Sequence, residues 1–188
     1  MLFISYFTSD LYERFGKRMK ASVERFGLEC LVLPEKDRGD WYVNRSMMPT
    51  FILEQMKAHP WHEAVCWLDA DAIMHKKPDL FLDPAADFDV AGYPDQMAKE
   101  VLWATLYFRN NEKGQKALTN WIGEVAKNPA IPHHGSYRQA LRNVPDIKVK
   151  VLGVEYCCIR RFYPACDPVI ENLAISRLLP AKREELLA

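Results

Sequence analysis

Hydrophobic positions in the first part of the chain follow strand and helix periodicity in turn. Leu2–Phe7 is a mainly apolar run, which predicts a buried strand. The next apolar positions recur every three or four residues, which predicts an amphipathic helix capped by Asp10 and ended by Gly27. A second apolar run, Glu29–Leu33, is closed by Pro34. This strand–helix–strand order predicts two parallel strands joined by a right-handed crossover.

The alternation continues into the middle of the chain and then becomes less regular. A helix is predicted over about Met48–His59, and the short apolar run Ala64–Leu68 has the character of a central parallel strand. The second half is predicted to contain strands at Asp89–Gly92, Thr105–Phe108 and Lys148–Leu152, and helices at Glu112–Lys127 and Tyr137–Arg142. These elements predict an α/β, Rossmann-like fold, with a mostly parallel sheet flanked by helices and a mixed second half.

Composition sets the limits of this picture. A chain of 188 residues, 49% of them hydrophobic, can bury a sizeable core, so residues 1–188 are predicted to form a single domain. The 25 basic and 25 acidic residues leave no positive surplus that would indicate nucleic acid as a partner. No apolar run reaches the roughly 18 residues of a transmembrane helix. The cysteines, odd in number and without zinc-ribbon spacing, predict reduced thiols and a cytoplasmic location.

Two carboxylates, Asp69 and Asp71, follow the third predicted strand directly. Ligands of open α/β sheets bind at this carboxyl edge, and two neighbouring carboxylates repel each other unless a cation lies between them. Mn²⁺ and Mg²⁺ prefer such oxygen ligands and can bind phosphate oxygens at their remaining positions. The pair therefore predicts a Mn²⁺ or Mg²⁺ site that holds a diphosphate. The alternative is a solvated turn, in which aspartate is common.

The segment Trp67-Leu68-Asp69-Ala70-Asp71-Ala72 is the most specific of several that occur in a recognisable order. The others are Ser5–Thr8, Ser22–Leu28, Trp41–Arg45, Pro49–Ile52, Trp103–Phe108 and Pro168–Arg177. They are spread from residue 5 to residue 177, and they resemble a small bacterial and phage branch of the GT-A family of nucleotide-diphospho-sugar glycosyltransferases; the resemblance covers most of the chain. The resemblance implies a GT-A-like fold, with residues from 1 to about 95 forming the half that binds the sugar donor. Residues from about 96 to 188 would form the acceptor half and the C-terminal segment.

The resemblance also implies partners and residue roles. The donor would be a nucleotide-diphosphate sugar, and the acceptor an unknown glycan, lipid or protein. Asp71 would bind the metal directly, and Asp69 would contact the metal or the ribose. The residues expected to contact the nucleotide, through its base, ribose or phosphates, are Tyr6, Thr8, Trp41 and Arg45. Asp95 and His134 are the candidates for a general base, and the stretches Trp103–Phe108 and His133–Gln139 are expected to frame the acceptor.

Three positions depart from the family pattern. Asn172 stands where the family has a histidine near the metal, and its carbonyl oxygen is expected to serve as a weaker ligand. Met48 replaces a lysine, and the stretch that begins at Tyr137 replaces an acidic acceptor motif. These departures keep open a nucleotide-sugar-binding protein without activity. A phosphatase of the haloacid-dehalogenase type is less favoured, because that class places its acidic pair on the first strand.

Overall fold

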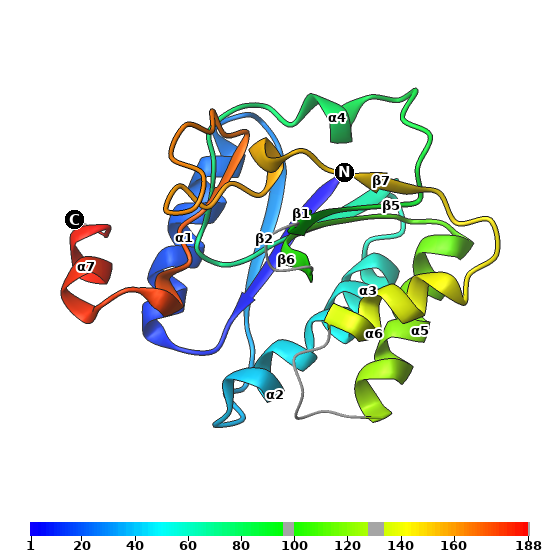
Figure 1. Ribbon diagram of the computed structural model, residues 1–188, viewed down its shortest axis with the longest axis horizontal. Coiled ribbons are helices and arrows are strands. Elements are labelled where there is room, and N and C mark those ends of the chain that lie inside the picture. The colour runs from blue at the N-terminus through cyan, green and yellow to red at the C-terminus, as the bar shows by residue number, and fades with distance from the viewer. Residues whose placement is uncertain (96–99, 128–133, 188) are drawn as a thin grey trace.

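The computed structural model describes residues 1–95, 100–127 and 134–187, without the side chains at 95, 100–102, 134 and 177. A six-stranded sheet runs through its centre (Figure 1), with the strand order β2-β1-β3-β6-β5-β7. The strands are β1 (Leu2–Phe7), β2 (Glu29–Pro34), β3 (Ala64–Leu68), β5 (Val90–Asp95), β6 (Glu100–Arg109) and β7 (Val149–Val151). Strand β1 pairs in parallel with β2 and β3, and β5 with β7, whereas β6 is antiparallel to both of its neighbours. The sheet is therefore regular in the first half of the chain and mixed in the second, as predicted.

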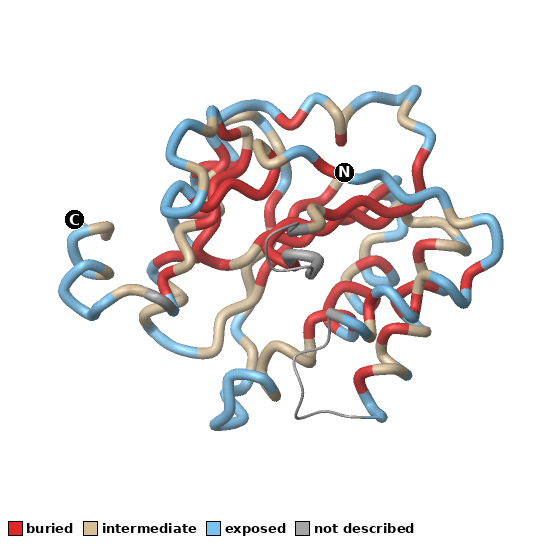
Figure 2. Tube along the Cα trace, viewed as in Figure 1, coloured by how far each residue is buried: buried red, intermediate tan, exposed pale blue. Residues whose placement is uncertain are grey.

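Helices cover both faces of the sheet. Helix α1 (Asp10–Glu24) lies on one face, and α3 (Met48–Ala58), α5 (Glu112–Lys127) and α6 (His134–Arg142) lie on the other (Figure 1). Alternate residues of β1 belong to different cores: Ile4 packs in the cluster that contains α3 and α5, and Phe3 in the cluster that contains α1. Successive side chains of a strand point to opposite faces, so a strand between two helical layers is buried on both. Figure 2 shows this buried centre.

The strongest periodic patterns in the sequence are confirmed at or near their predicted bounds. Strand β1 and helix α5 begin and end where they were predicted, and β2 is one residue longer because it includes Pro34. Gly27 follows α1 with a φ of 73°, the left-handed conformation expected of it. The predicted cap at Asp10 is wrong by one residue. Ser9 has the extended cap conformation, and its carbonyl accepts from the Glu13 N–H.

Several short elements were not predicted. They are α2 (Trp41–Ser46), β4 (Ala72–Met74), α4 (Asp79–Leu82), two 3₁₀ turns (Val154–Tyr156 and Ile175–Arg177), β8 (Ile170–Asn172) and α7 (Pro180–Glu185). Strand β4 pairs with β8 in an antiparallel ribbon that sets Ala72 opposite Asn172. The ribbon brings the C-terminal part of the chain against the segment that follows β3. Within the described part of the chain, no helix combines the length and the apolar character needed to cross a membrane.

Candidate functional site

Asp69 and Asp71 lie in the turn that joins β3 to β4. The Asp69 N–H donates to the Ala104 carbonyl on β6 at 3.0 Å, and the Ala72 N–H donates back to the Asp69 carbonyl at 2.9 Å. These bonds close the turn at the carboxyl end of β3, beside the end of the parallel strand β1. Both carboxylates therefore lie at the edge where open α/β sheets bind their ligands.

The C-terminal segment holds Asp71 by both carboxylate oxygens. The Ile175 N–H donates to Oδ2 at 2.7 Å, and the Asn172 amide group donates to Oδ1 at 3.3 Å. The Asn172 carbonyl oxygen accepts from the Ala174 N–H at 3.0 Å. Ala174 has a left-handed backbone with a φ of 51°, which turns the chain so that the next N–H faces the carboxylate. The turn from Asn172 to Ile175 therefore fixes the orientation of Asp71, which is only 6% exposed.

Burial makes the two negative charges unfavourable. Desolvation raises the pKa of Asp71 to about 7, and the neighbouring Asp69 carboxylate adds to the shift. Desolvation also raises the pKa of Asp69, although the Arg45 guanidinium and a hydrogen bond from the Trp67 indole, at 3.1 Å, oppose the rise. A divalent cation would remove this penalty, so the oxygen donors of the pair fit Mn²⁺ or Mg²⁺. Among the described residues, no group of three or more His, Cys, Asp and Glu side chains is arranged so that it could hold a metal ion.

Three of the residues expected to contact the nucleotide are linked to one another near Asp69. Tyr6, the next-to-last residue of β1, is half-buried; its hydroxyl donates to the Asn44 carbonyl at 2.7 Å, and its ring packs against Trp67. Arg45 of α2 acts electrostatically on both Tyr6 and Asp69. Trp41 begins α2 and is 47% exposed. The structure therefore brings Tyr6, Trp41 and Arg45 together beside Asp69, and Thr8 follows β1 as a half-buried residue.

The residues proposed for the acceptor side are less well placed by the structure. Asp95 ends β5 and His134 opens α6, but both side chains lie outside the described part of the structure. The expectation that Trp103–Phe108 frames an acceptor is wrong, because each of these side chains is at least nine-tenths buried in the sheet. Tyr137 is also a core residue, packed against Trp121 and Phe108.

Sequence reasoning missed Tyr12 of α1. Its hydroxyl interacts with Ser176, and the charges of both carboxylates of the acidic pair act on it. Burial is the main cause that raises the pKa of Tyr12 to about 12, followed by the charges of Asp71 and Asp69. Position 12 lies in the first turn of an amphipathic helix, where a tyrosine carries no distinctive signal. The packing of α1 against β4 brings this residue to the site, and the C-terminal segment adds its contact with Ser176.

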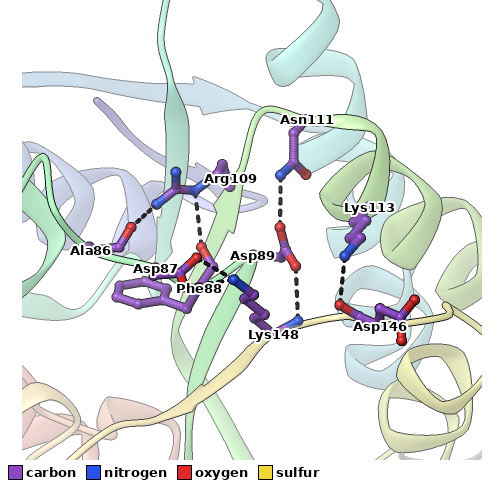
Figure 3. Close-up of polar contacts among 9 residues, drawn as sticks. All are labelled: Ala86, Asp87, Phe88, Asp89, Arg109, Asn111, Lys113, Asp146 and Lys148. Carbon is purple, nitrogen blue, oxygen red and sulfur yellow. Dashed lines mark hydrogen bonds and ion pairs between the residues drawn. The ribbon is translucent and has the colours of Figure 1, made fainter.

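A second polar cluster surrounds a hollow of ≈ 380 Å³ (Figure 3). It lies at the opposite end of the sheet from the acidic pair, because Arg109 pairs with Ala64 at the start of β3. Asp89, which is buried, accepts from the Asn111 amide at 2.8 Å and from the Lys148 N–H at 2.9 Å. The Lys148 ammonium pairs with Asp87, and Arg109 donates to the carbonyls of Ala86 and Phe88. The buried carboxylate has its partners within the fold, so this cluster ties β5, β6 and β7 together.

Comparison with known proteins shows which fold this is. No family model matches the chain, and no curated protein matches it. A solved glycosyltransferase involved in glycosylation of the major capsid of PBCV-1 has a TM-score of 0.79 at 13% identity, covering 99% of this chain and 97% of that one. The galactosyltransferase LgtC, solved with donor and acceptor sugar analogues, has a TM-score of 0.58 at 12% identity. The match covers 99% of this chain and 94% of LgtC.

A third structure, the glycosyltransferase GlyE of Streptococcus pneumoniae TIGR4, has a TM-score of 0.55 at 14% identity. There the match covers 91% of this chain and 53% of the longer protein. At these identities the likeness concerns the fold. The chain therefore has the mixed α/β, GT-A-like fold of these glycosyltransferases, in a single layered domain.

Proposed function

We propose that this protein is a metal-dependent glycosyltransferase that transfers a sugar from a nucleotide-diphosphate donor. The observation that carries the proposal is the acidic pair of half-buried Asp69 and buried Asp71 at the carboxyl edge of the sheet. Its carboxylates are costly to keep charged without a cation, and Asp71 is oriented by hydrogen bonds to both of its oxygens. The likeness to solved glycosyltransferases in fold supports the same conclusion.

The acidic pair would bind the metal, and the residues around Asp69 would bind the nucleotide. Asp69 and Asp71 would hold Mn²⁺ or Mg²⁺, with Asn172 beside them, either as a ligand or as the group that orients Asp71. The bound cation would stabilise the negative charge that grows on the diphosphate leaving group. The nucleotide would lie over the ends of β1 and β3. The residues proposed to contact it are Tyr6, Thr8, Trp41, Arg45 and Asp69.

The acceptor would approach from the second half of the chain. An unknown glycan, lipid or protein would present a hydroxyl group to the sugar. Asp95 and His134 are the proposed general bases, because Asp95 ends β5 at the boundary of that half, His134 begins α6 within it, and either side chain can accept a proton. A cytoplasmic location stays a prediction from the number and spacing of the cysteines.

Donor hydrolysis tests the proposal. The wild-type protein would be incubated with Mn²⁺ and a panel of UDP-, GDP-, CDP-, ADP- and dTDP-sugars, with release of nucleoside diphosphate as the readout. We expect one donor class to be hydrolysed, and Asp71→Asn to lose most of that activity together with Mn²⁺ binding. Asp83→Asn is the matched control, since Asp83 is an exposed carboxylate outside the acidic pair.

Two results would contradict the proposal. If the wild-type protein binds a nucleotide sugar but turns none over, with or without a panel of acceptors, the inactive binding protein becomes the better description. If Asp71→Asn binds Mn²⁺ and nucleoside diphosphate as tightly as the wild-type protein, the acidic pair is not the metal site.

A further inference from the structure

Arg45 is held between two tryptophan rings. Its guanidinium carbon lies 5.0 Å from the ring centroid of Trp41 and 5.0 Å from that of Trp103. Both distances are within the range of cation–π attraction. A planar cation between two aromatic rings has its faces covered, while the N–H groups at its edge stay in the plane between the rings. This arrangement differs from that of a solvated helix arginine, which is the ordinary state of such a residue.

The stack is built from two separate parts of the chain. Trp41 and Arg45 are four residues apart on α2, so they lie on the same side of that helix. Trp103 comes from β6 and is 3% exposed, and its ring packs edge-on against Trp121 of α5 at 5.0 Å. The inner ring is therefore fixed in the core. The outer ring, that of Trp41, is 47% exposed and belongs to α2. The hydrogen bond from the Tyr6 hydroxyl to the Asn44 carbonyl joins α2 to β1.

The edge of the Arg45 guanidinium is available to a ligand. Among the described residues, Arg45 takes part in no hydrogen bond or ion pair, although it is half-buried. The nearby acid on which it acts is Asp69, the first member of the acidic pair. If a metal neutralises Asp69, Arg45 is left as a positive group beside the place where a diphosphate would bind.

We propose that Trp41, Arg45 and Trp103 form a phosphate clamp, in which the Arg45 edge binds the diphosphate of the donor and the two indoles hold it in position. The inference rests on the proposed function and assigns Arg45 to the phosphates, leaving the base to other residues. Guanidinium forks match phosphate oxygens in pairs, and a fixed fork loses little entropy on binding. The ring faces that enclose Arg45 are covered by it, so they offer a nucleotide base no stacking surface. Trp103 is a positioning residue that acts through Arg45.

Calorimetry with truncated ligands tests the clamp. The nucleoside diphosphate that the wild-type protein binds, from UDP, GDP, CDP, ADP and dTDP, would be compared with its monophosphate and its nucleoside, all in Mn²⁺. We expect Arg45→Gln to weaken binding of the diphosphate by about 10- to 100-fold, the loss typical of a charged hydrogen-bonding group. Binding of the nucleoside should change less than about twofold, which is under 0.4 kcal/mol by the same conversion.

Two further variants separate the clamp from simple charge. Arg45→Lys keeps the positive charge but removes the planar fork, so it should lose most of the diphosphate affinity that Arg45→Gln loses. Trp41→Ala removes the outer ring without opening the core and should weaken the diphosphate by a smaller factor. Arg38→Gln is the matched control for net charge, because Arg38 is an exposed arginine just before α2. Circular dichroism and thermal melting would show that each variant is folded.

The possible failures are distinguishable. If the wild-type protein binds none of the five nucleoside diphosphates, the proposed function fails and the clamp fails with it. If the wild-type protein binds one of them and Arg45→Gln binds it equally well, only the clamp is overturned. An equal loss for the nucleoside and the diphosphate would assign Arg45 to the base, and an Arg45→Lys variant that binds the diphosphate as tightly as the wild-type protein would show that charge alone suffices. Either of these results also overturns the clamp.

Discussion

Replacing Asp71 with asparagine is expected to stabilise the metal-free protein at alkaline pH. The Asp71 carboxyl is 6% exposed and its pKa rises from 3.8 to about 7, chiefly because burial disfavours its charged form. The unfolded chain releases this proton near pH 3.8, whereas the folded protein retains it until about pH 7. The folded state therefore binds the extra proton, so the contribution of Asp71 to stability is most favourable below pH 3.8 and becomes less favourable as the pH rises towards 7.

The size of the effect follows from the pKa. Each pKa unit corresponds to about 1.36 kcal/mol, so the charged carboxylate makes folding about 4 kcal/mol less favourable above pH 7. Asparagine has nearly the same shape and carries no charge. It keeps one acceptor for the Ile175 N–H but turns an N–H group towards the Asn172 amide, at a cost of about 1 to 2 kcal/mol. The free energy of unfolding of Asp71→Asn should therefore exceed that of the wild-type protein by about 2 to 3 kcal/mol at pH 8.

Urea unfolding in EDTA at pH 5, 6, 7 and 8 would measure this difference. At pH 5 the two proteins should have nearly equal stability, and the gap should open as the pH rises. Adding Mn²⁺ should stabilise the wild-type protein at pH 8 and leave Asp71→Asn unchanged, because a cation that binds the folded state removes the penalty. The reasoning would be refuted by a wild-type protein whose stability in EDTA rises between pH 5 and pH 8, or by an Asp71→Asn variant that is less stable at pH 8.

Two further predictions concern the scaffold, and urea unfolding checks both. Gly114→Ala should lower the free energy of unfolding by about 2 to 4 kcal/mol, because its Cβ would lie 2.1 Å from the Arg109 carbonyl oxygen. Gly123→Ala, in the same helix with open space around its Cβ, should raise it by up to about 1 kcal/mol, and equal effects would contradict the steric explanation. Asp89→Ala should cost about 2 to 4 kcal/mol because the Asn111 amide and the Lys148 N–H lose their acceptor. Asp87→Ala, which removes an exposed ion pair, should lower the free energy of unfolding far less than Asp89→Ala does, and a similar loss in both variants would argue against the buried cluster.

The elements that the sequence predicts well are those whose pattern repeats over several turns or fills a strand. Helix α5 buries Ala117, Leu118, Trp121 and Val125 on one side, and this spacing is visible in the chain without any tertiary information. Strand β3 is buried along its whole length, so its apolar run between charged residues is equally plain. The acidic pair could be located for the same reason, because it follows β3 directly.

The ribbon of β4 and β8 shows the limit of local patterns. Each strand has three residues, too few to display a period, and the pairing joins Ala72 to Asn172 across a hundred positions of sequence. Helix α2 has no buried residue by which an apolar face could be recognised. The Arg45 stack depends on both α2 and β6, so neither segment by itself indicates it.

The role of Asn172 is set by the turn around it more than by its own chemistry. A carbonyl oxygen at this position can bind a hard cation, but in the fold that oxygen accepts the Ala174 N–H while the amide group donates to Asp71. A neutral histidine has one donor nitrogen and one acceptor nitrogen, on opposite sides of its ring. If the donor nitrogen faced Asp71, the acceptor nitrogen would face away from the Ala174 N–H. Asparagine serves both neighbours with a short side chain. The left-handed Ala174 then directs the Ile175 N–H to the second oxygen of Asp71. The C-terminal segment thus orients Asp71 and reaches Asp69 through Asn172, while Arg45 from the first half of the chain offsets part of the charge of Asp69.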